Sequence, residues 1–229
     1  MERHFQKELE SLKTTLVKMG SVVEENLGEA IRSALEKDAD LASKVVEKDK
    51  RVDALEIEND NAIIDLLALQ QPLASDLRFI LAALKINNDL ERIGDHAVNI
   101  AQSALVLCKL TDAVTIDEIP KMAAITKAML KDALDGFILL DPIKAKGVLT
   151  KDDEIDNLNR DVAKKVIELV KNNSRTIECG LELNRVSRNL ERVGDLATNI
   201  AEEVIFHTQA RVVKHHAEEK KVPPENDAK

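Results

Sequence analysis

A twelve-residue segment that occurs twice constrains this chain more than any other feature of its sequence. Residues 90–101 recur as residues 190–201, with nine of twelve positions identical and an offset of 100 residues. That offset is too long for a solenoid repeat and matches the size of a small duplicated domain. We therefore expect two halves of one fold, residues 1–112 and 113–210, followed by a charged flexible tail at residues 211–229.

Composition and turn signals predict that both halves are helical. The chain of 229 residues has no Trp, no Tyr, four Phe, seven Gly and five Pro, and it is 44% hydrophobic and 33% charged. This balance is typical of long amphipathic helices. Turn signals divide the chain into six helical stretches, and they fall at residues 37–40, 71–72, 111–120, 141–142 and 171–174. We predict an all-α fold of six long helices, arranged as two tandem three-helix bundles.

An apolar seam repeats in the third helical stretch of each half. Heptad-like spacing predicts that its members face the core. In the first half these are Phe79, Ala83, Ile86, Leu90, Ile93, Ala97, Ile100, Ala104 and Leu107. In the second half they are Leu183, Val186, Leu190, Val193, Ala197, Ile200 and Val204. The shared pattern indicates that the duplication is structural.

Charge and hydropathy exclude several classes of function. The 42 acidic and 33 basic residues give a net charge of -9, and a duplex nucleic-acid surface needs a positive footprint instead. No apolar stretch is long enough for a signal sequence or a membrane span. Cys108 and Cys179 form no CxxC pair and fit free thiols in a reducing compartment. We expect a soluble cytoplasmic protein that neither binds nucleic acid nor inserts into a membrane.

Pairs of carboxylates four residues apart lie beside the seam. Such spacing places both members of a pair on one face of a helix. The pairs are Glu91 and Asp95, Glu191 and Asp195, Asp49 and Asp53, and Asp152 and Asp156. Asn99 and Asn199 extend two of these rows by a turn and are candidate additional ligands. Because like charges repel at this spacing, the rows favour a bound cation, and oxygen ligands suit hard metals.

Two other readings of the acidic rows stay open. The rows are also typical of a solvated helix face whose charge is balanced by Arg92, Arg192, Lys50 or Lys151. Gly94 and Gly194 lie beside the rows inside helical stretches, where Gly costs about 1 kcal/mol relative to Ala. Their missing Cβ atoms allow either a metal-ligand cluster or simply a tightly packed neighbouring helix.

At these residues the chain resembles the PhoU family of phosphate-transport accessory proteins. The resemblance covers about residues 1 to 210, and its most specific part runs from residue 74 through the repeated segment at residue 101. It implies two three-helix bundles that hold multinuclear metal clusters, with iron the main candidate and manganese, magnesium, zinc or calcium as others. The implied sites are Asp49, Asp53, Glu91 and Asp95 in the first half, and Asp152, Asp156, Glu191 and Asp195 in the second.

The same resemblance implies a regulatory function. Members of the family act as negative regulators of phosphate uptake and of the phosphate-starvation response. Their implied partners are the ATPase of the phosphate ABC transporter and a phosphate-sensing histidine kinase, and a homodimer is the implied oligomer. The expected role is therefore that of an adaptor and not of an enzyme.

Two other classes of function are alternatives to this role. A carboxylate-bridged di-metal enzyme uses Glu-x-x-His on two helices, but residue 94, three positions after Glu91, is Gly. The sequence also has no GxxxxGK[ST], HExxH or GxSxG motif. A purely structural helical scaffold is the second alternative, and it makes the acidic rows surface decoration.

Overall fold

The computed structural model describes residues 2–70, 72, 74–111 and 114–210, and within them all regular structure is helical. The expected boundary between residues 112 and 113 and the expected tail at residues 211–229 lie outside the described residues. The elements in chain order are α1 (Glu2–Glu36), α2 (Ala39–Lys48), α3 (Lys50–Gln70), α4 (Ala74–Leu107), α5 (Glu118–Leu139), α6 (Pro142–Leu149), α7 (Asp152–Asn172), the 3-10 helix η1 (Ser174–Thr176) and α8 (Ile177–Gln209).

The all-α prediction and the six helical stretches are confirmed, with one difference. The second stretch of each half is divided into two helices, α2 with α3 and α6 with α7. The first division falls at Asp49 and the second at Thr150 and Lys151. Both divisions therefore lie at the start of an acidic row.

The same turn joins the first and second stretches of each half. α1 is followed by Lys37 at φ 56°, and α5 is followed by Leu140 at φ 52°, so both helices end on a left-handed residue that is not glycine. The next residue then caps the following helix. Asp38 accepts a hydrogen bond from the Leu41 N–H, and Asp141 accepts one from the Ile143 N–H, both at 2.9 Å. Such caps satisfy backbone N–H groups that the first turn of a helix leaves unpaired.

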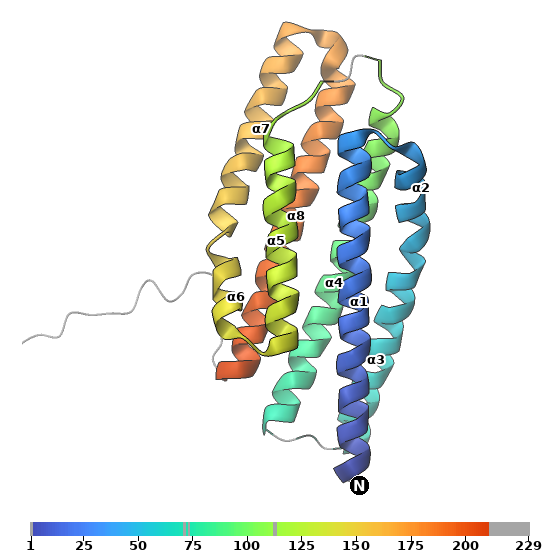
Figure 1. The fold of residues 1–229 in the computed structure, drawn as a ribbon, viewed down its shortest axis with the longest axis vertical. Helices are drawn as coiled ribbons and strands as arrows, with labels where there is room; N and C mark the ends of the chain where they lie inside the picture. The colour runs from blue at the N-terminus through green and yellow to red at the C-terminus, as the bar shows by residue number, and fades with distance from the viewer. Residues whose placement is uncertain (1, 71, 73, 112–113, 211–229) are drawn as a thin grey trace, which may run out of the picture.

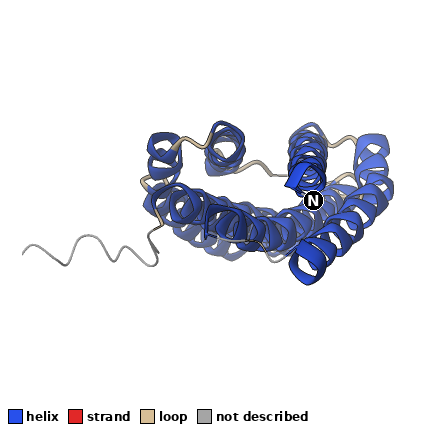
Figure 2. Cartoon of the chain, turned by 90° about the horizontal axis from the view of Figure 1, so that it is seen from below, coloured by secondary structure: helices blue, strands red, loops and turns tan. Residues whose placement is uncertain are grey.

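The helices stand in two layers along one long axis (Figures 1 and 2). α1 and α5 lie side by side in one layer, and α4 and α8 lie behind them, while α2–α3 and α6–α7 occupy the two flanks. The interface between α4 and α8 is the most extensive one in the described structure. These two helices are antiparallel, because Lys85 of α4 contacts Glu203 of α8 whereas His96 contacts Asn189.

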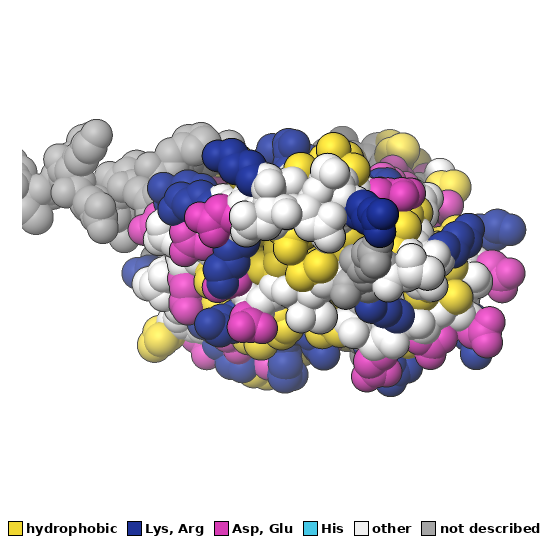
Figure 3. All heavy atoms as spheres, turned by 90° about the horizontal axis from the view of Figure 1, so that it is seen from above, with side chains coloured by type: hydrophobic (Ala, Val, Ile, Leu, Met, Phe, Trp, Pro, Cys, Tyr) yellow, Lys and Arg dark blue, Asp and Glu magenta, His cyan; other side chains and the backbone are white. Residues whose placement is uncertain are grey.

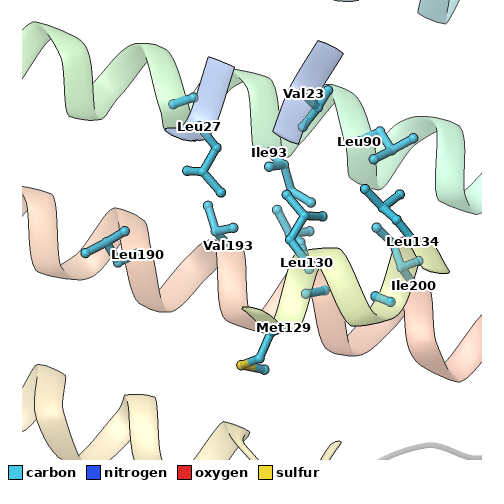
Figure 4. Packing of buried hydrophobic residues seen from close by; sticks show 14 of the residues in the cluster. Val23, Leu27, Leu90, Ile93, Met129, Leu130, Leu134, Leu190, Val193 and Ile200 are labelled. Carbon is cyan, nitrogen blue, oxygen red and sulfur yellow. The ribbon is translucent and has the colours of Figure 1, made fainter. Parts of the chain in front are cut away.

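A single hydrophobic core joins the two halves. Both predicted seams are confirmed, because each of their members is buried. Figure 4 shows Val23 and Leu27 of α1 packed toward Ile93, Leu130 and Val193 of the other central helices. Leu90 and Leu190, equivalent members of the two repeats, are both 0% exposed. Burial of aliphatic side chains from four helices thus holds the halves together.

The surface of the upper end carries charges of both signs (Figure 3). Lysine and arginine side chains alternate there with aspartate and glutamate, and hydrophobic atoms show between them. None of the helices that the structure describes combines the length and the apolar character that crossing a membrane requires.

Candidate metal centres

The structure places the predicted carboxylates in two clusters at equivalent places in the halves. The first acidic cluster combines Asp49, at the division between α2 and α3, and Asp53 of α3 with Glu91 and Asp95 of α4. The second acidic cluster consists of Asp152, Asp156, Glu191 and Asp195, from α7 and α8. Each cluster therefore lies where a divided stretch packs against the repeated segment of the third stretch.

The second acidic cluster has the tighter geometry. Carboxylate oxygens of Asp156, Glu191 and Asp195 all lie within 4.8 Å of one another, which occurs for no other group of three metal-ligating side chains among the described residues. The fourth member, Asp152, accepts a hydrogen bond of 3.4 Å from the Thr198 hydroxyl. Burial, followed by the charges of Glu191 and Asp152, raises the pKa of Asp195 to about 6. The negative charges of these carboxylates therefore act on one another.

Two arginines, Arg192 and Arg188, partly offset this negative charge. Arg192 Nη1 lies 3.3 Å from Asp195 Oδ2, and its Nε lies 3.6 Å from Glu191 Oε2. Burial raises the pKa of Glu191, and the positive charges of Arg192 and Arg188 oppose that rise. The Arg192 guanidinium thus lowers the repulsion between two of the three carboxylates, Glu191 and Asp195.

The first acidic cluster is more open and more strongly charged. Burial, followed by the charges of Asp53 and Asp95, raises the pKa of Asp49 to about 6. Burial and then the surrounding carboxylates, led by Asp95 and Glu56, raise the pKa of Glu91 to about 7. Within the described residues none of the four members forms an ion pair with a basic side chain.

Glu56 and Asp60 extend the first cluster along α3, and the sequence reasoning missed them. Burial, followed by the charges of Asp60, Asp53 and Asp95, raises the pKa of Glu56. Asp60 accepts a hydrogen bond of 2.9 Å from Asn87. The positions 103 residues later hold Asn159 and Ala163, so a search for acidic pairs shared by both halves passes over them. The sequence signal that could have identified them is their spacing: Asp53, Glu56 and Asp60 are three and four residues apart and so lie on one helix face.

The structure places Asn99 and Asn199 against the opposite half and not at the clusters. Asn99 Oδ1 accepts a hydrogen bond of 3.2 Å from Arg185 of α8, and Asn199 hydrogen-bonds Asp89 of α4. The reason is helical geometry. Four residues turn an α-helix about 40° beyond one full turn. Asn99, eight residues after Glu91, therefore lies about 80° away from it around the helix axis.

The two glycines of the repeat bring the helices of each cluster together. A Cβ atom on Gly94 would lie 3.1 Å from Asp49 Oδ1 and 3.2 Å from Val52 Cγ1. A Cβ atom on Gly194 would lie 3.1 Å from Ile155 Cδ1. Helix packing therefore accounts for Gly194, while Gly94 also makes room for a carboxylate of the first cluster.

The donor chemistry of both clusters fits a hard cation. Every member offers carboxylate oxygen, the ligand type that iron, manganese, magnesium and calcium accept, and neither cluster contains Cys or His. His96 follows Asp95 in sequence, but its Nδ1 lies 2.8 Å from Asn189 Oδ1 across the α4–α8 interface. Burial and then carboxylate repulsion raise the pKa values of Asp49, Glu91 and Asp195, and a bound cation would relieve the repulsion.

Fold and site together define a class: an all-α protein duplicated from one helical unit, with an acidic cluster on each copy. Comparison with known proteins places the chain within that class. It belongs to the PhoU family, because the PhoU domain model matches it twice, at residues 16–104 and 119–204.

Relatives of this chain support the assignment over most of its length. It is 35% identical over 202 residues to the phosphate-specific transport system accessory protein PhoU homolog of Zymomonas mobilis, covering 88% of this chain and 85% of that protein. It is 33% identical to the PhoU protein of Escherichia coli K12, covering 92% and 88% respectively. The crystal structure of PhoU from Pseudomonas aeruginosa aligns with a TM-score of 0.88 at 33% identity, covering 90% of this chain and 100% of that one.

Proposed function

We propose that this chain is a regulatory accessory protein of phosphate transport that binds hard metal ions at both acidic clusters. The observation that carries the metal-binding part is the convergence of Asp156, Glu191 and Asp195 within 4.8 Å. The observation that carries the transport part is the family membership, since the curated relatives are named phosphate-specific transport system accessory proteins. The bound species would be multinuclear metal clusters, with iron the first candidate by resemblance to the family.

In this proposal the protein acts as a cytoplasmic adaptor and negative regulator. Its partners are the ATPase of the phosphate ABC transporter and a phosphate-sensing histidine kinase, and it works as a homodimer. The long helices offer exposed surface for such contacts, including apolar side chains at Ile57, Ile64 and Ile143 that are 61%, 61% and 82% exposed.

Each acidic cluster has a defined role in the proposal. Its carboxylates hold the cation and thereby tie α3 to α4 in the first half and α7 to α8 in the second. A cation held by carboxylates can also bind further oxygen ligands. Occupancy of the clusters would therefore set the shape and charge of the surface that a partner meets.

Functional replacement in Escherichia coli K12 tests the proposal, because that organism has a relative 33% identical to this chain. The relative is deleted and replaced by this chain, or by its variant carrying E91Q, D95N, E191Q and D195N. The chain is expected to keep a phosphate-starvation reporter off in high phosphate, and the variant is expected to fail at equal protein level. A reporter that stays on with both would contradict the regulatory role, and one that stays off with both would contradict the metal requirement.

A further inference from the structure

A shallow groove on α8 carries three arginines on one helix face. Its volume is about 300 Å³, and no acidic side chain lines it. The lining residues are Leu181, Asn184, Arg185, Arg188, Asn189 and Arg192. Like charges at this spacing destabilise a helix, and the chain as a whole has a net charge of -9. A local concentration of cations on such a protein therefore calls for a specific cause.

The internal duplication shows how this positive charge arises. In the first half Lys85 lies 2.7 Å from Glu203, and Arg92 lies 3.8 Å from Asp89. One hundred residues away, the matching acids are replaced by neutral side chains: Asn189 takes the place of Asp89, and Ser103 that of Glu203. The second half has kept both cations, as Arg185 and Arg192, and lost these two carboxylates.

A third cation is added in the same groove. Position 88 is Asn in the first half, whereas its counterpart in the second half is Arg188. Arg188 is exposed, and within the described residues it forms no hydrogen bond or ion pair. Arg185 donates hydrogen bonds to the neutral oxygens of Asn99 and Gln102, at 3.2 and 3.1 Å. Arg185 also pairs with Glu182 at 3.9 Å, and the charge of Arg188 acts on the nearby Glu191. Among the described residues, Arg188 is therefore the arginine of the groove that no carboxylate holds in an ion pair.

The first-half surface beside α4 has the opposite character. A groove of about 460 Å³ there is lined by Lys85 and by five carboxylates. These are Glu56, Asp60, Asp89, Glu202 and Glu203. Duplication would have produced similar surfaces on both halves, so the two copies have diverged to opposite sign.

From these observations we infer that the arginine groove of α8 binds an oxyanion with two or more negative charges, the chemistry of a phosphoryl group. Guanidinium groups donate parallel N–H bonds that match phosphate oxygens, and several of them on one face suit a multiply charged anion better than a single carboxylate. Arg188 and Arg185 would supply the contacts, while Arg192 stays with the second acidic cluster. This site needs no bound metal, so it goes beyond the proposed function.

Titration of metal-free protein tests the inference. Protein treated with a chelator is titrated at low ionic strength with inorganic phosphate, and the arginine Nε–Hε signals are followed by NMR. The wild type is expected to show saturable shifts of the Arg188 signal. Arg188→Gln is expected to weaken binding about tenfold, the effect of one charge-assisted hydrogen bond. Lys44→Gln, which removes an exposed lysine of α2, serves as the control and should change affinity less than twofold.

Three results would overturn the inference. The first is that neither inorganic phosphate nor ADP produces saturable shifts of the arginine signals. The second is that Arg188→Gln and Lys44→Gln weaken phosphate binding equally. The third is that a polyglutamate peptide binds while phosphate produces no response. The last result would identify a protein-docking surface instead. ADP in a parallel titration separates the two sources of a phosphoryl group, because tighter binding of ADP than of phosphate indicates a nucleotide. Since no metal is present, failure here leaves the metal proposal untouched.

Discussion

Lys48 Nζ lies 2.7 Å from Glu29 Oε2. Lys48 immediately precedes Asp49 of the first acidic cluster. The second half repeats this contact 103 residues later. Lys151 Nζ lies 2.9 Å from Asp132 Oδ2, immediately before Asp152. The ion pair is therefore part of the duplicated unit, and it holds each divided stretch against the first helix of its half where the acidic row begins.

Breaking this ion pair should cost a small and measurable amount of stability. Lys48→Ala is expected to lower the free energy of unfolding by about 0.5 to 1 kcal/mol, because the side chains are partly exposed. Lys48 also pairs with Glu25 at 3.0 Å, so the double-mutant cycle uses Glu29→Ala and the double variant Lys48→Ala with Glu29→Ala instead of a charge exchange. Urea denaturation of the single and double variants measures the coupling energy. Lys44→Ala on the same helix is the control, and an equal loss there would refute a specific role for Lys48.

Substitution of Gly94 should reveal how closely α4 approaches the first acidic cluster. Gly94→Ala is expected to destabilise by about 1 kcal/mol, because crowding of Asp49 and Val52 outweighs the better helix propensity of Ala. Gly147→Ala is the matched control, since its Cβ would meet no atom within 4 Å, and it should stabilise by up to about 1 kcal/mol. Thermal unfolding measures both, and a stabilised Gly94→Ala would contradict the packing described.

The acidic clusters predict that metal-free protein loses stability as pH rises. The pKa of Glu91 is raised to about 7 and those of Asp49 and Asp195 to about 6, against values near 4 in the unfolded chain. Between pH 4 and 7 the folded state thus binds more protons than the unfolded state, so these groups reduce stability as they ionise. Melting temperatures across this range should fall more steeply for wild type than for Glu91→Gln, and identical slopes would contradict the pKa shift.

The contact between Lys85 and Glu203 should matter more than a surface ion pair. Glu203 is 7% exposed, and its second carboxylate oxygen has no hydrogen-bond partner in the structure. Lys85→Ala leaves that buried carboxylate uncompensated and is expected to cost about 2 kcal/mol. Adding Glu203→Gln should recover much of the loss, because the buried charge is then gone. Chemical denaturation of both variants decides this, and an unchanged Lys85→Ala would show that the pair contributes nothing.

The parts of the fold that follow from periodic burial could be predicted from sequence. The seams through Leu90 and Leu190 were predictable because a packed helix buries one face at regular spacing. The divisions of the second stretches were not. Asp49 itself has φ −59° and ψ −34°, which are helical values, and no Pro or Gly marks the place. The local sequence therefore carries no helix-stop signal at Asp49.

The candidate site was predictable where both halves agree and obscure where they differ. Glu91 and Glu191 were found because the repeat carries them at equivalent positions. Glu56 and Arg188 were missed because each has a counterpart of different chemistry, Asn159 and Asn88. The two clusters and their surroundings differ because the two copies have diverged. This divergence can be recognised only when the structure shows which side chains share a surface.

Metal content is the most direct test of the central claim that the carboxylate clusters are metal sites. Untagged protein purified without chelator is analysed by inductively coupled plasma mass spectrometry, beside a variant in which Glu91, Asp95, Glu191 and Asp195 are changed to Ala. We predict more than one equivalent of iron or another hard metal per wild-type chain, lost in a variant that remains helical by circular dichroism. A wild type that is empty and cannot be reloaded, or a variant that keeps its metal, would contradict the account.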